Sequence, residues 1–330
     1  MKRQRGIFLL RFKQAHNREK PMNKYQLTGD SRLHDYLVDG NKQQVKLWQI
    51  VALCDFNDVR HGQLGGWVEN EDNLSQQGNC WIYSDESVVF GGSTVEEEAQ
   101  IYGASTLCHQ AHVSGQSVVN ESLVSGECRI YDSARILNGS QVIAVRGLTA
   151  DNDQLLQIYG NATVNASRVV HQAQIFGNAV VSNAFIEHRA EVFGQAILEG
   201  NDENNIWICD CARVFDNARI IAGRGDDQIP TIRYSSQVYG NALIEGDCVL
   251  KHQVHIFDNA TLVGGPIQLD NQVQIYGQAR VTGNVLIENN VQIYDKAAID
   301  GLDGEAIHIR GIKDISGEQR ITRSPFYGVF

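Results

Sequence analysis

Residues 158–195 read IYGNATVNASRVVHQAQIFGNAVVSNAFIEHRAEVFGQ and contain one pentad three times. IYGNA at 158–162 returns as IFGNA at 175–179 and as VFGQA at 192–196, each copy 17 residues after the last. Between these copies aliphatic residues follow one another at steps of five or six, and Ala stands two places before them. A fixed period of this kind is typical of a hexapeptide-type repeat solenoid.

Three such steps make one turn of a parallel β-helix with three short faces. The aliphatic residue and the Ala before it point inward, and the residue after the aliphatic points outward, because side chains alternate along a strand. The Gly or Asp that follows suits a corner with a positive φ angle. Successive turns hydrogen-bond at a spacing of roughly 4.8 Å, so no turn is stable alone and the array needs caps. The sequence therefore predicts an all-β fold, a single-stranded parallel β-helix.

The aromatic position of the pentad recurs along most of the chain. Five steps separate Ile101 from Ile130, which is not a multiple of three. Either a step is hidden there or the pentad moves to another face. The aromatic residues are followed by Gly or Asp, with Ser84 the one exception, and they are Tyr83, Tyr102, Tyr131, Tyr159, Phe176, Phe193, Phe215, Tyr239, Phe257, Tyr276 and Tyr294.

The repeat fills most of the 330 residues, which indicates one elongated domain with a cap at each end. DGNK at 39–42, between two apolar runs, predicts a β-hairpin in the N-terminal cap. The expected divisions are a basic leader at 1–21, an N-terminal β-rich cap at 22–79, the β-helix at 80–301 and a C-terminal cap at 302–330. Insertions are expected at 143–157, 200–205 and 223–230.

The basic leader does not share the repeat pattern. It ends at Lys20 and Pro21, just before Met22, which suggests that Met22 is the natural start. We therefore expect an upstream-start artefact or a disordered arm, and a functional basic arm is the alternative.

Charge is unevenly distributed along the chain, whose formal net charge is −11. Residues 1–24 hold eight basic residues against Glu19 alone. This leaves 20 of the 28 basic and 38 of the 39 acidic residues, a net charge of −18, for the remainder. Because an acidic body repels polyanions, neither nucleic acid nor an anionic membrane is expected as a partner.

The sequence shows no targeting or membrane segment. The apolar run at 7–10 is far shorter than the core of a secretory signal, and no run reaches transmembrane length. Cys80, Cys128 and Cys248 occupy the inward slot that Ala fills elsewhere, so we expect them to pack in the core. We therefore expect a cytoplasmic, reduced protein.

A row of polar residues stands four places before the pentad aliphatics in the middle of the chain. Equivalent positions of successive turns stack, so this row should form one polar ladder along a corner, with His171 directly beside His188. A neutral imidazole beside a carboxylate is a usable general base near neutral pH. The alternative is that an exposed corner accepts any polar residue. The polar ladder consists of His171, His188, Asp210, Tyr234, His252 and Asn271, with Glu187, Arg189, Lys251 and His255 nearby.

A separate histidine pair, His109 and His112, has a spacing that could serve a metal. It has no carboxylate or Cys support in the sequence around it. No Walker-type phosphate loop, nucleophile elbow or HExxH motif occurs either. The sequence therefore predicts no metal site.

Eleven outward aromatic rings would make an apolar stripe larger than monomers usually expose. Burial in a parallel homo-oligomer, most simply a trimer, is the favoured explanation. A stacking platform for sugar rings and coverage by an insertion, notably 143–157, are the alternatives. Mutual stacking of the rings would stabilise the turns under all three.

The alternation of aliphatic and small residues over roughly residues 80–300 resembles the hexapeptide-repeat superfamily of acyl- and acetyltransferases. This resemblance implies left-handed winding, a homotrimer with sites between subunits, a His general base and an acyl-thioester carrier in the groove between helices. The sequence lacks the C-terminal helical segment with which many members bind the carrier. From Met22 onward the chain is also similar to the YdcK proteins, described as transferases. The segments that carry this likeness are DFNDV at 55–59, GGWV at 65–68, LSQQG at 74–78, FIEHRA at 185–190, WICDCA at 207–212 and RYSSQV at 233–238.

The first functional hypothesis is therefore an acyl- or acetyltransferase. It would move an acyl group from acetyl-CoA or another acyl-CoA to a hydroxyl or amine of a small, sugar-like acceptor. The second hypothesis is a non-catalytic scaffold or glycan-binding solenoid that uses aromatic residues such as Phe176 and Phe193. The candidate residues for catalysis are His188 as base, Glu187 or Asp210 to orient it, His171 or His252 as the fallback base, and Arg189 and Arg224 for the carrier phosphates.

Overall fold

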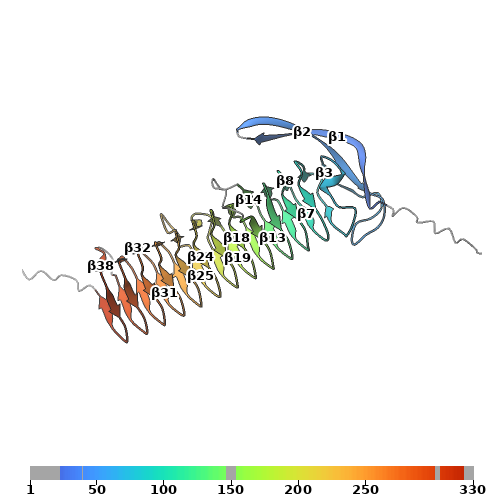
Figure 1. Cartoon of the computed structure of the whole chain (residues 1–330). Helices are drawn as coiled ribbons and strands as arrows, with labels where there is room; N and C mark the ends of the chain where they lie inside the picture. Colours follow the sequence, from blue (N-terminus) through green and yellow to red (C-terminus); the bar gives the residue numbers. More distant parts are fainter. Residues whose placement is uncertain (1–22, 39, 146–153, 302–304, 323–330) are drawn as a thin grey trace, which may run out of the picture.

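The computed structural model describes residues 23–38, 40–145, 154–301 and 305–322 (Figure 1). They form an elongated parallel β-solenoid whose turns stack from the blue N-terminal end to the red C-terminal end. Among these residues the only helical segment is the 3-10 helix η1 (Glu71–Asn73). The predicted fold class, an all-β parallel β-helix, is confirmed. The leader expected at 1–21 lies outside the described residues.

Each full turn contributes one short strand to each of three sheets. Parallel neighbours stay in register, so Ile175 lies beside Val192 and Val192 beside Val214. The 15-stranded sheet comprises β1 (Tyr25–Val38), β2 (Asn41–Ala52), β3 (Leu64–Val68), β5 (Val88–Val89), β8 (Thr106–Cys108), β11 (Leu123–Ser125), β14 (Gln141–Ala144), β17 (Arg168–His171), β20 (Ala184–Ile186), β23 (Ile206–Ile208), β26 (Thr231–Ile232), β29 (Cys248–Lys251), β32 (Ile267–Asp270), β35 (Val285–Glu288) and β38 (Ile307–Arg310).

The other two sheets complete the triangular cross-section. The 12-stranded sheet comprises β6 (Thr94–Val95), β9 (His112–Val113), β12 (Cys128–Ile130), β15 (Leu156–Ile158), β18 (Gln174–Ile175), β21 (Glu191–Val192), β24 (Arg213–Val214), β27 (Gln237–Val238), β30 (His255–Ile256), β33 (Gln274–Ile275), β36 (Val291–Ile293) and β39 (Lys313–Ile315). The 13-stranded sheet comprises β4 (Trp81–Ile82), β7 (Gln100–Tyr102), β10 (Val118–Asn120), β13 (Arg135–Leu137), β16 (Thr163–Asn165), β19 (Val180–Ser182), β22 (Ile197–Glu199), β25 (Arg219–Ile221), β28 (Leu243–Glu245), β31 (Thr261–Val263), β34 (Arg280–Thr282), β37 (Ala298–Asp300) and β40 (Arg320–Thr322).

The chain passes from the 15-stranded to the 12-stranded sheet, then to the 13-stranded sheet, and back. We name the three corners by the sheets that they join: the 15/12, 12/13 and 13/15 corners. Inward aliphatic residues such as Ile175 are fully buried, and so is Ala173 in the small slot before it. The three cysteines expected in that slot, Cys80, Cys128 and Cys248, are buried as well. Each inward aliphatic side chain contributes about 1.5–3 kcal/mol by leaving water.

The aromatic pentad changes face, which settles the question raised by the uneven spacing. Ile82 in β4 and Ile101 in β7 belong to the 13-stranded sheet, whereas Ile130 in β12 belongs to the 12-stranded sheet. No step is hidden between them, because β8 to β11 supply all the intervening strands. The same local sequence can therefore build more than one corner.

From Tyr131 to Tyr294 the aromatic residues form a single stack at the 12/13 corner, which we call the aromatic ladder. Neighbouring ring centroids lie 4.7–5.1 Å apart, and neighbouring planes are within 6° of parallel. Each of these rings is half-buried, whereas the sequence suggested an exposed stripe that needed a partner. Mutual stacking thus shields the rings within one chain.

The backbone at the 12/13 corner explains the Gly or Asp after each ring. Gly177 and Gly194 have φ of +75° and +74°, and Asp216 has φ of +57°. The Asp216 Oδ2 also accepts a hydrogen bond of 3.2 Å from the Gly240 N–H in the next turn. Asp therefore tolerates the left-handed corner and satisfies a backbone donor there.

The insertions leave the solenoid at two different corners. Residues 200–205 and 223–230 both lie at the 13/15 corner, where Asn204 Nδ2 donates to the carbonyl oxygens of Gly223 and Gly225 at 3.0 and 2.8 Å. The first insertion leaves at the 15/12 corner between β14 and β15, and its residues 146–153 lie outside the described ones. Insertions therefore flank both edges of the 15-stranded sheet in the middle of the solenoid.

The hairpin predicted around residues 39–42 is present, with β1 and β2 antiparallel and Val38 opposite Asn41. It reaches back beside the first turns of the solenoid (Figure 1). The Tyr36 ring lies 4.9 Å from the Phe90 ring and 5.8 Å from the His109 ring. The hairpin is therefore anchored on the outer side of the 15-stranded sheet.

Residues at the start of the hairpin contact the N-terminal end of the solenoid. The Tyr25 hydroxyl donates to the Leu74 carbonyl at 2.6 Å, and Lys24 Nζ donates to the Cys80 carbonyl at 3.0 Å. Burial lowers the pKa of Lys24 from its usual value. These side chains satisfy carbonyl groups where the stacking of turns begins.

The solenoid continues beyond Gly301, in the region that the sequence analysis assigned to the C-terminal cap. β38, β39 and β40 pair in parallel with the preceding strand of each sheet and form one more turn. This turn escapes the sequence pattern because Ser316 replaces the aromatic residue of the pentad. Among the described residues, no helix is long and apolar enough to cross a membrane.

Phe193→Ala tests the aromatic ladder, because Phe193 stacks on Phe176 and Phe215 at 4.7 and 4.9 Å. We expect this change to lower the free energy of unfolding by about 2–4 kcal/mol. Tyr294→Ala, at the end of the ladder, removes one described stack and should cost less. Urea denaturation followed by circular dichroism measures both variants. Equal losses would contradict a stabilising role for stacking between turns.

Candidate functional site

The polar ladder lies at the 15/12 corner, where the six residues of the row occupy equivalent positions. All six have φ between +50° and +65°. In this left-handed region Asn, Asp and His are several-fold enriched among residues other than Gly. The backbone therefore explains part of the polar composition, in line with the structural alternative considered from the sequence.

His171 and His188 lie side by side, with ring centroids 4.9 Å apart and planes within 12°. The His188 backbone N–H donates to His171 Nδ1 at 3.3 Å, so the neutral ring of His171 carries its proton on Nε2. Partial burial lowers the pKa of His171, the neighbouring His188 lowers it further, and the Glu187 carboxylate opposes both. His171 is therefore neutral near pH 7.

Asp210 lies directly against His188. Asp210 Oδ1 is 3.3 Å from His188 Nδ1, and Asp210 Oδ2 accepts a hydrogen bond of 3.2 Å from the Tyr234 N–H. Arg233 Nε lies 3.8 Å from the same Oδ2, too far for a hydrogen bond but close enough for charge attraction. With Nδ1 facing the carboxylate, neutral His188 carries its proton on Nδ1 and keeps Nε2 as the basic nitrogen. The His188 side chain is 49% exposed, so a substrate can reach it.

Glu187, the other residue considered for orienting the base, is anchored to the next turn. Its side chain is buried, and Glu187 Oε1 accepts a hydrogen bond of 2.7 Å from Trp207 Nε1. The carboxylate places a fixed negative charge close to both imidazoles. It can stabilise a proton on either ring.

Four outward side chains extend the site across the 15-stranded sheet: Arg168, Phe185, Trp207 and Arg233. The Phe185 and Trp207 rings are parallel with centroids 6.5 Å apart. Arg168 Cζ lies 5.5 Å from the Phe185 ring centroid, and Arg233 Cζ lies 5.0 Å from that of Trp207. We call these four residues the arginine–aromatic strip. It offers flat apolar surface bordered by cations.

No role for the arginine–aromatic strip was predicted from the sequence. The feature that indicates this strip is the register between turns, in which Arg168 lies beside Phe185 and Phe185 beside Trp207. This register is hidden in the sequence because the 200–205 insertion separates Phe185 from Trp207 by 22 residues instead of 17. Aligning the turns across the insertion would have revealed it.

His252 forms a separate pair with Asp270, with Nδ1 and Oδ1 2.7 Å apart. It lies three turns beyond His188, about 14 Å away at the usual spacing of strands. The two histidines therefore cannot act on one substrate atom. Further on, the ladder continues as a pair of amides, in which Asn271 Nδ2 donates to Asn289 Oδ1 at 2.7 Å.

The two arginines expected to bind the carrier lie at different corners. Arg189 is exposed and follows His188 at the 15/12 corner. Arg224 lies in the 223–230 insertion at the 13/15 corner, where its Nη1 is 3.6 Å from Asp202 Oδ1. The structure therefore groups Arg189 with the imidazoles and leaves Arg224 across the width of the sheet.

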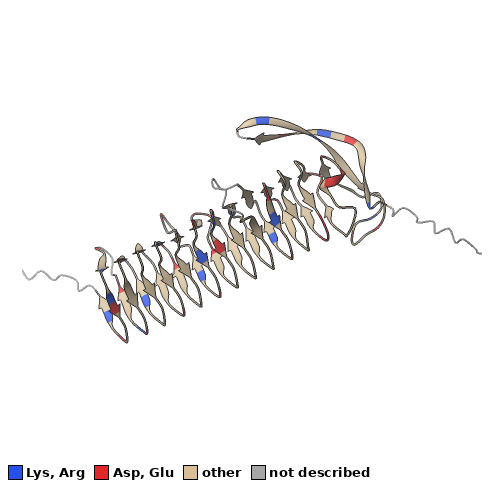
Figure 2. Ribbon diagram, in the orientation of Figure 1, with Lys and Arg blue, Asp and Glu red and all other residues tan. Residues whose placement is uncertain are grey.

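Charge around the site is locally positive within an acidic chain. Three arginines near the site, Arg168, Arg189 and Arg233, outnumber its two carboxylates, Glu187 and Asp210, whereas the whole chain has a net charge of −11. Figure 2 shows segments of Lys and Arg (blue) and of Asp and Glu (red) in several turns along the solenoid. An anionic group can therefore approach this region in spite of the overall charge.

His171, Glu187 and His188 are also the described residues that come closest to a metal-ligand set. Each offers one ligand atom, and these atoms lie within 4.8 Å of one another. His and Glu are ligands that zinc accepts, at about 2.0–2.2 Å. His109 and His112 do not belong to this cluster.

Glu187 raises the pKa of His171 and His188 lowers it, and these opposite effects give a test of the geometry. Glu187→Gln should lower the pKa of His171 further, because the carboxylate raises it. His188→Asn should raise that pKa, because a charged neighbouring imidazole lowers it. Proton–nitrogen NMR spectra of the imidazole groups, recorded as a function of pH, measure both. Shifts in the same direction, or wild-type titration above the usual value of about 6.5, would contradict the proposed contacts.

Comparison with known proteins shows the family to which the chain is similar. A family model described as the YdcK β-solenoid repeat matches residues 156–172, 173–189 and 236–251. The first two of these repeats contain His171, Glu187 and His188.

A relative from Escherichia coli (strain K12), described as "Uncharacterized acetyltransferase YdcK", is 48% identical to this chain. The alignment covers 93% of this chain and 100% of the relative. The likeness thus extends far beyond the three repeats that the family model matches. The chain belongs to the YdcK family of β-solenoid proteins.

Proposed function

We propose that this protein is an acetyltransferase that uses acetyl-CoA or another acyl-CoA and modifies a hydroxyl or amine of a small acceptor. The name of the Escherichia coli relative, which describes it as an acetyltransferase, supports the reaction class. The observation that carries the proposal is the His188–Asp210 pair, with the two facing atoms 3.3 Å apart. This pair leaves a basic nitrogen on an accessible ring at the surface of the solenoid.

In the proposed reaction, His188 Nε2 takes the proton from the acceptor hydroxyl or amine. The freed electron pair attacks the thioester carbonyl carbon, and the carbon–sulfur bond then breaks. The proton held by His188 passes to the departing thiolate. Asp210 keeps the ring in the tautomer with Nδ1 protonated and stabilises the imidazolium that forms.

His171 would act as a neutral donor beside the base. Its Nδ1 accepts from the His188 N–H, so its proton is on Nε2 and can be donated. Its lowered pKa keeps the ring neutral at the pH where His188 must accept a proton. A donor stacked 4.9 Å from the base can stabilise the oxygen that gains charge as the thioester is attacked.

The arginine–aromatic strip would bind the two substrates next to the imidazoles. The parallel rings of Phe185 and Trp207 can hold a sugar ring or the adenine of the carrier. Arg168, Arg189 and Arg233 would contact phosphates of the carrier. Arg224, at the other edge of the 15-stranded sheet, could meet only a distant part of an extended carrier.

We further propose that the protein works in the cytoplasm as a homotrimer, with the site completed by a neighbouring subunit. The exposed 15/12 corner supports this arrangement, because it covers a reacting group on one side only. A second subunit would exclude water from the thioester and supply the other wall of the carrier site.

The non-catalytic alternative also rests on a specific observation. The left-handed backbone of the 15/12 corner selects His, Asp and Asn without any need for catalysis. A scaffold or glycan-binding solenoid would have the same corner. Activity measurements on matched variants separate the two possibilities.

His188→Asn removes the base but suits the left-handed backbone, so the fold should be kept. We expect the rate of CoA thiol release from acetyl-CoA, measured with a panel of sugar and amine acceptors, to fall about 100-fold or more. His252→Asn makes the same change at the equivalent position three turns away and serves as the comparison. An unchanged rate in His188→Asn would remove His188 from the role of base. A loss confined to His252→Asn would transfer that role to the His252–Asp270 pair.

The assembly and the carrier can be tested together. Light scattering should give the mass of a trimer, and acetyl-CoA should raise the midpoint of thermal unfolding. For example, a carrier present at 100 times its Kd contributes about 2.7 kcal/mol of stability. A monomer that is indifferent to acetyl-CoA would contradict both proposals and favour the scaffold.

A further inference from the structure

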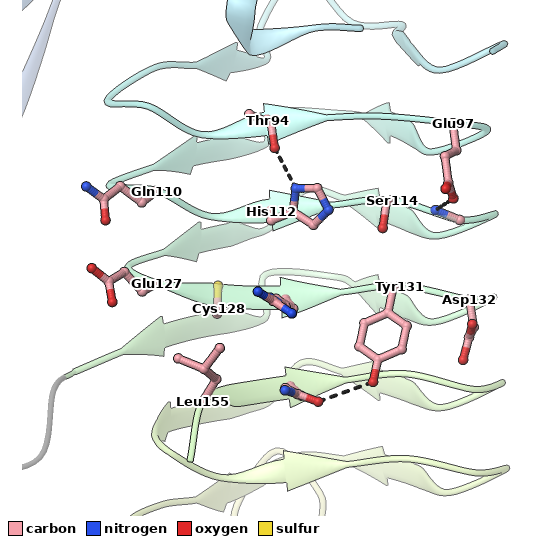
Figure 3. Close-up of a pocket in the computed structure, with 13 residues that line it drawn as sticks. Thr94, Glu97, Gln110, His112, Ser114, Glu127, Cys128, Tyr131, Asp132 and Leu155 are labelled. Atoms are coloured by element: carbon pink, nitrogen blue, oxygen red, sulfur yellow. Dashed lines mark hydrogen bonds between the residues drawn. The ribbon is translucent and has the colours of Figure 1, made fainter. Parts of the chain in front are cut away.

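The aromatic ladder ends at an open hollow on the 12-stranded sheet (Figure 3). The hollow has a volume of about 820 Å³, within the size range of small-molecule sites. It lies on a different face from the arginine–aromatic strip, which is on the 15-stranded sheet. Tyr131, the first ring of the ladder, forms part of its wall.

The hollow lies where the aromatic ladder ends, because the next ring position has no aromatic side chain. In the turn before Tyr131, Val113 lies beside Ile130, so the residue after it, Ser114, occupies the place of the next ring. A serine leaves empty most of the space that a tyrosine would fill. Among the described residues, Tyr131 stacks only on Tyr159, at 4.9 Å, and its other face has no ring partner.

The open ring is held in a fixed orientation. The Tyr131 hydroxyl donates to Gln157 Oε1 at 3.2 Å, as the dashed line in Figure 3 shows. Partial burial and the neighbouring Tyr159 and Asp132 raise the pKa of Tyr131, so the phenol keeps its proton. Within the described residues, the free face is therefore a preformed apolar surface.

The walls of the hollow carry hydrogen-bonding groups, several of them already oriented. His112 Nδ1 lies 2.6 Å from Thr94 Oγ1. Glu97 Oε2 accepts from the Gly115 N–H at 2.8 Å, and Asp132 Oδ2 accepts from the Gly160 N–H at 3.1 Å. These bonds orient each carboxylate and leave its second oxygen available, as far as the described residues show.

Arg129 adds a donor to these acceptors. Its side chain borders the hollow, and no described residue forms an ion pair with it. Glu97 and Asp132 outnumber this single cation among the lining residues. The hollow is therefore net negative, which disfavours phosphates and carboxylates.

We propose that this hollow binds a neutral pyranose sugar in the place of the missing ring. The C–H face of the sugar would lie on the open face of Tyr131. Its hydroxyls would donate to Glu97 and Asp132 and accept from Arg129. A flat apolar face with carboxylates around its rim matches a neutral polyhydroxylated ring better than an anion or a fully apolar ring.

This inference does not depend on the proposed transferase activity. The sugar site and the His188–Asp210 pair lie on different faces and share no residue. A glycan held here could be a partner of the protein without being the acceptor. Failure to observe acetyl transfer would therefore not contradict the sugar site. The test of the sugar site measures binding alone.

The test is saturation-transfer NMR with neutral oligosaccharides of glucose, galactose, mannose and N-acetylglucosamine. The wild-type protein should bind at least one of them through the C–H protons of a terminal ring. Ser114→Tyr supplies the missing ring, so it should weaken binding at least tenfold while raising the unfolding midpoint. Tyr131→Ala should also abolish binding. Tyr294→Ala removes the ring at the opposite end of the same ladder and should leave binding unchanged.

Three results would overturn the proposal. The first is that no neutral sugar in the panel binds the wild-type protein. The second is that Ser114→Tyr binds as well as the wild type does. The third is that adenosine or glucose 6-phosphate, included as a planar base and an anionic sugar, binds in preference to every neutral sugar.

Discussion

Backbone hydrogen bonds between successive turns hold each residue about 4.8 Å from its counterpart in the next turn. This distance suits stacked aromatic rings, which lie 4.7–5.1 Å apart in the aromatic ladder. It also brings Asp210 to His188 and stacks His188 on His171. Insertions lengthen the chain but leave this register intact, since Ile186 still lies beside Ile208. The aromatic ladder and the candidate site are therefore both columns of residues from different turns.

The same constraint explains what the sequence could predict. The inward aliphatic residues and the pairing of His171 with His188 follow from a period of 17 residues, which local spacing reveals. The face on which Tyr131 lies could not be predicted, because the pentad suits more than one corner equally well. Trp207 and Arg233 were missed for a related reason. Their neighbours come from other turns across insertions, and the loop lengths alone do not fix which residues align.

The 15/12 corner shows how a structural demand and a chemical one can be met by the same residues. A left-handed backbone favours His, Asp and Asn, and the Asn271–Asn289 pair satisfies that demand with amides alone. At His188 the neighbourhood differs, because Asp210, Glu187 and Trp207 form hydrogen-bonded or charged contacts around it. What distinguishes the candidate site is thus the outward surface of the adjoining 15-stranded sheet. The identity of the corner residue alone would not separate a base from a structural histidine.

Stacking of identical turns stabilises a solenoid, so a turn that departs from the repeat loses some of this stabilisation. Replacing a ring by Ser114 gives up one stack, about 0.5–1.5 kcal/mol beyond the buried area. The turn that contains Ser114 lies close to the turns of the polar ladder. Residues at the end of the first insertion lie next to both. Gln154 Nε2 donates to the Gln172 carbonyl at 3.1 Å, beside His171, while Leu155 lines the hollow. The missing ring at Ser114 and the end of the first insertion therefore lie close together, although stacking alone would favour one more identical turn.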